Sequence, residues 1–313
     1  MSTIRTYAQL CRLPAVFTAL ADIVLGFLLT RLTLAPVREF TSLLAASAGL
    51  YLAGMVLNDL FDRREDAIER PNRPIPAGRV SSRTATAVAG ALIVFGLSGA
   101  ALAGRNSLLI ALLLLGNIFL YDGWLKRTPL GPLAMGGCRF LNIILGASSA
   151  STRLVEAFLL PQLLVALGMG VYVVGVTWFA RRDSGRSPRG HLVAALAVVN
   201  LGLLILAAWI APEADRFLGA IGWQVYRGDA EPWRALALLG VIAFVLNRRA
   251  IGAILDPSPA VVQNAVRIML LSIITLDAML IYNKLGEAGT PYAVGTVALL
   301  VPALLLGRWM TMT

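Results

Sequence analysis

The stretch FTSLLAASAGLYLAGMVLNDLFDRRED, residues 40–66, joins a long apolar run to a dense group of acids. Residues 40–57 are apolar and long enough, as a helix, to cross the roughly 30 Å hydrocarbon core of a bilayer. The polar end, from Asn58 to Asp66, reads N-D-x-x-D-x-x-x-D. We therefore predict a membrane-spanning helix that ends in a carboxylate cluster at the membrane surface.

The spacing of these acids predicts a metal site. Asp59, Asp62 and Asp66 are spaced i, i+3, i+7, so on a continuous helix their side chains share one face. Three like charges on one face repel one another, and Mg²⁺ offsets carboxylate charge while leaving positions open for phosphate. Asn58 adds a carbonyl oxygen to this predicted metal-ligand set. The alternative is an ordinary solvated loop, because Arg and Glu residues lie between the aspartates.

The composition is that of a helical membrane protein with many spans. Hydrophobic residues make up 58% of the 313 residues and charged residues 14%, against about 25% charged in a soluble domain. The mean hydropathy is +0.77. We predict an all-α bundle of about nine transmembrane helices and a tenth, built as one domain over residues 1–313. The predicted spans are 13–30, 40–57, 84–103, 107–122, 131–150, 159–180, 190–211, 235–255, 265–283 and 291–307.

The distribution of basic residues predicts the orientation of the chain. If the N-terminus is cytoplasmic, the cytoplasmic stretches hold 18 of the 27 Lys and Arg residues and the opposite stretches hold 8. This bias follows the positive-inside rule. The basic residues behind the net charge of +10 therefore set the topology and bind acidic headgroups or phosphates. We expect no nucleic-acid partner. We predict a multi-pass protein of a bacterial inner membrane with the aspartate-rich loops in the cytoplasm.

Histidine and cysteine are too scarce for several kinds of site. One histidine excludes His-rich metal sites, and the two cysteines, Cys11 and Cys138, form no metal-ligand pattern or disulfide framework.

Basic residues follow the acids in a proline-rich loop. Residues 70–81, RPNRPIPAGRVS, contain three prolines and a glycine, which end a helix and stiffen the loop. Arg70 and Arg73 therefore stand near the acids, and a guanidinium fork binds phosphate oxygens. We predict that they contact a diphosphate; positive-inside anchoring is the alternative.

Three ionisable residues lie inside predicted spans, where they need partners. These are Asp22, Arg139 and Asp277. Arg139 and Asn142 are about one turn apart, and we expect both to face a central cavity. Asp277 either pairs with Arg139 or touches a substrate; a purely structural buried pair is the alternative.

Two segments carry a resemblance to a known family. NDLFDRREDAIERPNRPIPAGRVS resembles the first aspartate-rich motif and following loop of the UbiA superfamily of intramembrane prenyltransferases, and residues 121–131, YDGWLKRTPLG, are similar to that family's Y…LKR…G stretch. The resemblance implies a helical bundle around a cavity, Mg²⁺ as cofactor, and an isoprenyl diphosphate donor whose chain lies in a lipid-facing tunnel. It implies diphosphate contacts from Lys126 and Arg127, and cavity positions for Tyr121 and Asp122.

The third polar loop departs from the family pattern. The family has a second aspartate cluster there, whereas residues 177–186 read TWFARRDSGR. Asp183 is the only carboxylate, and Arg181 and Arg182 stand beside it, where they could neutralise a phosphate directly. Either the site uses one metal ion or its ionising chemistry is weakened. The T-W-F-A-R pattern also resembles the EboC branch of UbiA-like proteins.

The leading function is transfer of an isoprenyl group from its diphosphate to a hydrophobic acceptor, aromatic acceptors included, within the membrane. Asp62, Asp66 and Asp183 are then the catalytic carboxylates. The alternative is a weakened UbiA-like protein that binds or translocates a hydrophobic biosynthetic intermediate. A conventional secondary transporter is disfavoured, because no matched pair of Gly/Pro-broken helices is visible.

Overall fold

The computed structural model describes residues 3–159, 162–181, 187–211 and 230–309, and all regular secondary structure within these ranges is helical. The α-helices are α1 Thr3–Leu10, α2 Val16–Arg31, α3 Val37–Phe61, α4 Arg63–Glu69, α5 Ser82–Ala103, α6 Arg105–Gly123, α7 Gly131–Ala147, α8 Gln162–Phe179, α9 Arg189–Ile210, α11 Pro232–Leu255, α12 Pro259–Leu285, α13 Thr290–Ala298 and α14 Leu300–Trp309. Short 3₁₀ helices lie between them: η1 Leu13–Ala15, η2 Leu125–Arg127, η3 Ser148–Ala150, η4 Leu154–Phe158 and η5 Gly286–Gly289.

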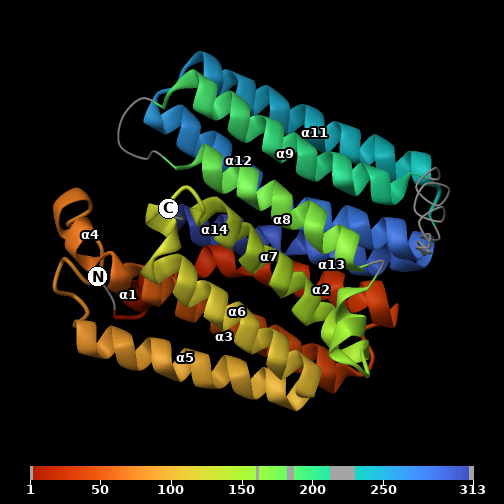
Figure 1. The fold of residues 1–313 in the computed structure, drawn as a ribbon, viewed down its shortest axis with the longest axis horizontal. Helices are drawn as coiled ribbons and strands as arrows, with labels where there is room; N and C mark the ends of the chain where they lie inside the picture. Colours follow the sequence, from red (N-terminus) through yellow and green to blue (C-terminus); the bar gives the residue numbers. More distant parts are fainter. Residues whose placement is uncertain (1–2, 160–161, 182–186, 212–229, 310–313) are drawn as a thin grey trace.

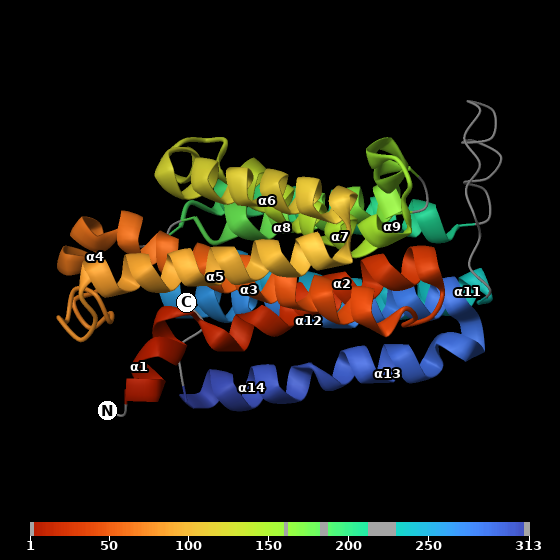
Figure 2. The ribbon, with the colours of Figure 1, turned by 90° about the horizontal axis from the view of Figure 1, so that it is seen from below.

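The predicted membrane spans are confirmed. In the described part of the chain, nine segments are long and apolar enough to cross a membrane, and the first eight correspond closely to the predicted ones. The ninth, Pro259–Arg308, contains both of the last two predicted spans. Within it, α12 crosses the bundle, and α13 and α14 return end to end beside it (Figure 2). The tenth predicted span is therefore a pair of consecutive helices.

The long helices lie side by side and place the polar loops at one end (Figure 1). Helix α3 packs against α5, α2 against α7, and α8 against both α7 and α9, while α12 contacts α2 and closes the bundle. Helices α1 and α4 and the end of α14 lie at the same end (Figures 1 and 2). The loop at η2 also reaches α4, through an ion pair between Arg127 and Glu65. The third predicted polar loop, 181–190, falls partly outside the described residues.

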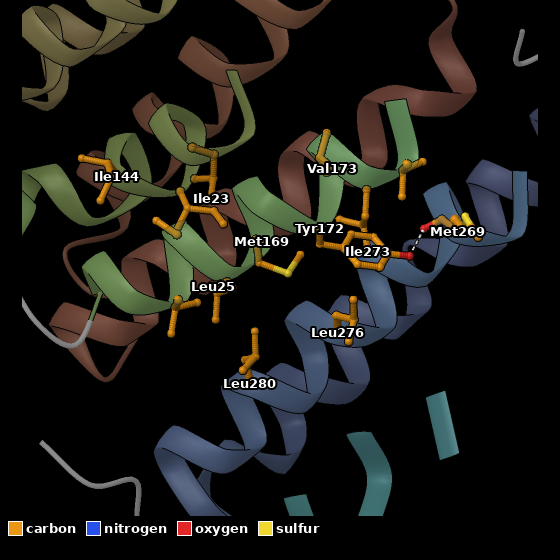
Figure 3. Packing of buried hydrophobic residues seen from close by; sticks show 14 of the residues in the cluster. Ile23, Leu25, Ile144, Met169, Tyr172, Val173, Met269, Ile273, Leu276 and Leu280 are labelled. Carbon is orange, nitrogen blue, oxygen red and sulfur yellow. Dashed lines mark hydrogen bonds between the residues drawn. The ribbon is translucent and has the colours of Figure 1, made fainter. Parts of the chain in front are cut away.

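The interior is packed with apolar side chains from α2, α7, α8 and α12 (Figure 3). Met169 and Tyr172 of α8 lie toward Ile273 and Leu276 of α12, and all four are fully buried. The Tyr172 hydroxyl donates a hydrogen bond to the Met269 carbonyl oxygen at 2.9 Å. The ring can thus be buried without leaving an unpaired polar group.

Close approach of α2 and α7 depends on glycine. A Cβ added at Gly26 would lie 2.2 Å from the Ile143 carbonyl oxygen, which is backbone and cannot move aside. We expect Gly26→Ala to destabilise the protein by about 1–3 kcal/mol through overpacking. Gly116→Ala is the matched control, because nothing lies within 4 Å of its added Cβ. Thermal unfolding of both variants in detergent tests this, and equal melting temperatures would contradict the close contact.

Candidate active site

The acidic motif lies across a break between two helices. Helix α3 ends at Phe61, Asp62 connects it to α4, and α4 begins at Arg63. The prediction that the three aspartates share one face of a continuous helix is therefore wrong. The backbone turns at the end of the span, and the N–H of Asp66 donates to the Asp62 carbonyl oxygen at 2.8 Å. The break divides the three acids between two groups.

The first acid pair is Asp59 and Asp66, with Arg73 between them. Arg73 Nη1 lies 2.6 Å from Asp66 Oδ2 and 3.1 Å from Asp59 Oδ1. Both carboxylates are nearly inaccessible, with 4% and 7% of their side chains exposed. Arg12 Nη2 also lies 3.3 Å from Asp59 Oδ1 and donates to Asn58 Oδ1. The predicted nearness of Arg73 to the acids is confirmed, whereas Arg12 was not predicted as a site residue.

The second acid pair is Asp62 and Asp122, with Lys126 between them. Lys126 Nζ lies 2.6 Å from Asp62 Oδ1 and 3.8 Å from Asp122 Oδ1. Asp122 is buried at the end of α6, and it accepts a hydrogen bond from Asn58 Nδ2 at 2.8 Å. Asn58 thus connects the two pairs. Asp122, predicted only as a cavity residue, is part of the acid cluster.

The proline-rich loop gives Arg73 its position. The backbone N–H of Arg73 donates to the Arg70 carbonyl oxygen, and the N–H groups of Arg79 and Val80 both donate to the Pro74 carbonyl oxygen. Val80 is buried and fixes the far end of the loop. Gly78, at φ 70°, occupies the left-handed region that favours glycine. The loop therefore folds back and directs Arg73 toward the acids.

The remaining predicted site residues are distributed differently. Arg127 is half-exposed and contacts both Glu65, at 2.9 Å, and Asp62, at 3.8 Å. Arg70 is half-buried at the end of α4, Tyr121 is half-buried beside Asp122, and Arg181 is exposed. Asp183 and Arg182 lie outside the described residues.

Arg139, Asn142 and Asp277 form a separate buried network deeper in the bundle. Arg139 pairs with Asp22 of α2, and Asn142 Nδ2 also donates to Asp22 at 2.8 Å. Asp277, one partner predicted for Arg139, lies beside Asp22 instead. Among the described residues, neither of its carboxylate oxygens has a hydrogen-bond partner. Ser47, which donates to Asn142 Oδ1, precedes Asp59 by 12 residues of α3. That is about 18 Å along the helix axis.

One thiol next to the acid cluster has a shifted pKa. Burial, and to a smaller extent the nearby Asp59 carboxylate, raises the pKa of the Cys11 thiol to about 11, because both disfavour the thiolate. Because the thiolate is the reactive form, alkylation at pH 8 should be slow and should accelerate as the pH approaches 11. The measurement is the pH–rate profile of iodoacetamide labelling in a Cys138→Ala background. A midpoint near the ordinary value of 9.0 in the folded protein would contradict this, and the denatured protein is the control.

Comparison with known proteins assigns the family. The sequence profile described as the UbiA prenyltransferase family matches residues 19–251. The chain belongs to the UbiA prenyltransferase family. It is 36% identical over 277 residues to the digeranylgeranylglyceryl phosphate synthase of Methanopyrus kandleri, which covers 78% of this chain and 99% of that protein. The enzyme of the same name from Methanothrix thermoacetophila is 36% identical over 125 residues, or 40% of this chain and 45% of that protein.

Solved structures show the same UbiA fold. A digeranylgeranylglyceryl phosphate synthase superposes with a TM-score of 0.62 at 17% identity, covering 95% of this chain and 99% of the other. A UbiA homologue from Archaeoglobus fulgidus bound to GPP and Mg²⁺ superposes with a TM-score of 0.56 at 16% identity, covering 94% and 99%. The predicted helical UbiA architecture is therefore confirmed. The named relatives are not EboC proteins, so the comparisons give that branch no support.

Proposed function

We propose that this UbiA-family prenyltransferase uses Mg²⁺ to transfer an isoprenyl group from an isoprenyl diphosphate to a hydrophobic acceptor in the membrane. The observation that carries the proposal is the two carboxylate pairs at the end of the bundle, each with a basic side chain between its members. We place this end in the cytoplasm because of the distribution of Lys and Arg. The bacterial inner membrane predicted above gains no support from the relatives, which are mostly archaeal.

The acid pairs fit Mg²⁺. Among the described residues, no three His, Cys, Asp or Glu side chains converge on one metal position, so Asn58, Asp59, Asp62 and Asp66 do not form a single ligand set here. Mg²⁺ does not require one, because it is commonly bound by one or two carboxylates together with substrate phosphates and water. The available donors are all oxygen, which this ion prefers. Asp59 with Asp66, and Asp62, are the residues that would hold it.

The transfer divides into bond breaking and bond formation. The allylic C–O bond breaks, the diphosphate leaves with the electron pair, and the acceptor nucleophile bonds to the resulting carbon and releases a proton. Bound Mg²⁺ would supply positive charge to the departing diphosphate. Arg73, Lys126 and Arg127 carry the further donors at this end that can bind phosphate oxygens. The buried apolar interior beyond them keeps water from the cationic carbon.

The relatives suggest which substrates to test first. Their name, digeranylgeranylglyceryl phosphate synthase, describes a product with two geranylgeranyl groups on glyceryl phosphate. Geranylgeranyl diphosphate and a geranylgeranylglyceryl phosphate are therefore the first donor and acceptor. An aromatic acceptor is the second to test.

Binding and transfer by the purified protein test the proposal. We expect geranyl, farnesyl or geranylgeranyl diphosphate to bind in detergent with Mg²⁺, and the binding to be lost in EDTA. Addition of the acceptor should then give a prenylated product. Absence of Mg²⁺-dependent binding at every chain length would overturn the proposal.

A binding or translocation function without transfer is the second candidate. It is favoured by the third loop, where Arg181 and Arg182 precede the single acid Asp183. Mg²⁺-dependent donor binding without product from any acceptor would support this second function.

A further inference from the structure

Helix α12 carries a buried acid that belongs neither to the acid cluster nor to the proposed transfer. Asp277 is completely buried. Ile274 and Ile281, about one turn before and after it on the same face, are completely buried as well. Water therefore does not surround this carboxyl group. An ionised carboxylate in such a place is strongly disfavoured unless an opposite charge and hydrogen bonds compensate it.

The group packed against Asp277 is a second acid. Asp22 of α2 is also completely buried, and its carboxyl group lies within hydrogen-bonding reach of Asp277. Asp22 Oδ2 accepts hydrogen bonds from Arg139 and Asn142, whereas Asp22 Oδ1 accepts none. Both oxygens of Asp277 are also without a donor. In the described part of the chain, three buried carboxyl oxygens thus meet without a hydrogen bond among them.

The charges at this position do not balance if both acids are ionised. Among the described residues, the guanidinium of Arg139 is the only cation that acts on Asp277, and it is already paired with Asp22. On α12 itself the nearest charged residue is Lys284, seven positions later, which is about 10 Å along the helix axis. Two carboxylates in contact in an apolar interior cannot both remain ionised. One further positive charge is therefore needed.

We propose that Asp22 and Asp277 form an intramembrane proton-binding site, in which a proton on Asp277 is donated to Asp22 Oδ1. A protonated carboxyl group has one O–H donor, and Asp22 Oδ1 is an acceptor that lacks one. The proton makes the cluster of two acids and one guanidinium neutral. A metal ion fits less well, because no third His, Cys, Asp or Glu joins the two acids in the described structure. The site takes part in no step of the proposed transfer.

The bound proton connects α12 to a hydrogen-bond network that already joins three other helices. Asn142 of α7 donates to Asp22 of α2 at 2.8 Å, and Ser47 of α3 donates to Asn142 at 2.8 Å. Helix α12 packs against α2, and the O–H of Asp277 adds a polar link to that contact. Loss of the proton would remove this link and leave a second buried negative charge. The folded bundle should therefore become less stable when the site is deprotonated.

The pH dependence of unfolding tests the site against Asp277→Asn, whose amide can donate to Asp22 Oδ1 but does not titrate. A free aspartate ionises at about pH 4, so above that value folding of the wild type takes up one proton. The stability that this proton contributes is complete below about pH 4 and falls as the pH rises. Relative to Asp277→Asn, the unfolding equilibrium constant of the wild type should rise about tenfold per pH unit.

Unfolding by SDS in mixed micelles, between about pH 6 and pH 9, gives this ratio, in which the other titrating groups cancel. Asp256→Asn is the matched control, because Asp256 is an exposed acid at the end of α11 whose carboxylate accepts from the Ser258 N–H. We expect the ratio of wild type to Asp256→Asn to be independent of pH.

Infrared spectroscopy gives an independent signature. A protonated carboxyl group has a C=O stretching band separate from the bands of carboxylates, and exposed acids are ionised at about pH 8. We expect this band in the difference spectrum of wild type minus Asp277→Asn, and none in that of wild type minus Asp256→Asn.

Three results would overturn the proton site. One is a ratio of wild type to Asp277→Asn that does not change with pH. Another is a ratio that follows the Na⁺ concentration instead, which would assign the position to a metal ion. The third is a wild-type spectrum at about pH 8 without a protonated-carboxyl band, which decides the question even if Asp277→Asn does not fold. Each leaves the prenyltransferase proposal standing.

Discussion

Replacement of Asp62 by alanine is expected to abolish prenyl transfer while the protein remains folded. Asp62 lies between α3 and α4, and its carboxylate contacts Lys126 and Arg127 rather than core side chains. Its loss removes one of the acids that would hold Mg²⁺ at the diphosphate. Removal of one such electrostatic contributor costs about 10²–10³-fold in rate, and a missing metal ion costs more.

Product formation and thermal unfolding, measured on the same preparation, check this prediction. Glu69→Ala is the matched control, because Glu69 is an exposed acid on α4. We expect wild-type transfer and an unchanged melting temperature from Glu69→Ala. We expect Asp62→Ala to unfold cooperatively at a modestly lower temperature, because Lys126 keeps Asp122 as a partner. Transfer retained by Asp62→Ala would exclude the metal role assigned to this residue.

The second large effect concerns stability. Arg139 and Asp22 form an ion pair inside the bundle, with 11% and 0% of their side chains exposed. Arg139 also donates to the Thr18 carbonyl oxygen at 2.9 Å. Arg139→Ala leaves Asp22 as a buried carboxylate without its cation, and removal of one partner of a buried pair costs about 3–5 kcal/mol.

Replacement of both partners should recover much of this loss. In Asp22→Leu/Arg139→Met neither member of the ion pair remains as an unpaired charge, and apolar replacements of buried pairs are often neutral or stabilising. Unfolding by SDS in mixed micelles gives the free energies of unfolding of the wild type, of Arg139→Ala and of the double variant. Arg105→Ala, at an exposed position, controls for the general loss of an arginine. A double variant no more stable than Arg139→Ala would show that the network does more than neutralise Asp22.

The spans could be predicted from sequence because bilayer thickness sets the length of each apolar run. The prolines and glycine of residues 70–81 also marked the loop that directs Arg73. Periodicity failed at Asp62, because i, i+3, i+7 spacing assumes a helix that continues, and α3 ends as it leaves the apolar region. Nothing in the local sequence near Phe61 marks this end as strongly as a proline would.

The partners of buried charges could not be predicted, because they depend on which helices become neighbours. Arg139 pairs with Asp22 because α7 packs against α2, a contact between residues 117 positions apart. Asp122 joins the acid cluster because α6 lies against α3. Both acids were visible in the sequence as charges in or next to apolar spans, a signal that something must pair with them but not what.

The basic side chains between the acids have a consequence for handling the protein. Arg73 and Lys126 are internal counterions, so the carboxylates keep opposite charge nearby when no metal is bound. Folding therefore does not depend on a metal supply, in contrast to small zinc domains that unfold in chelators. The protein can be extracted from membranes and purified in EDTA. Metal and diphosphate can then be added back immediately before the assay. Inactivation by a chelator should be reversible for the same reason.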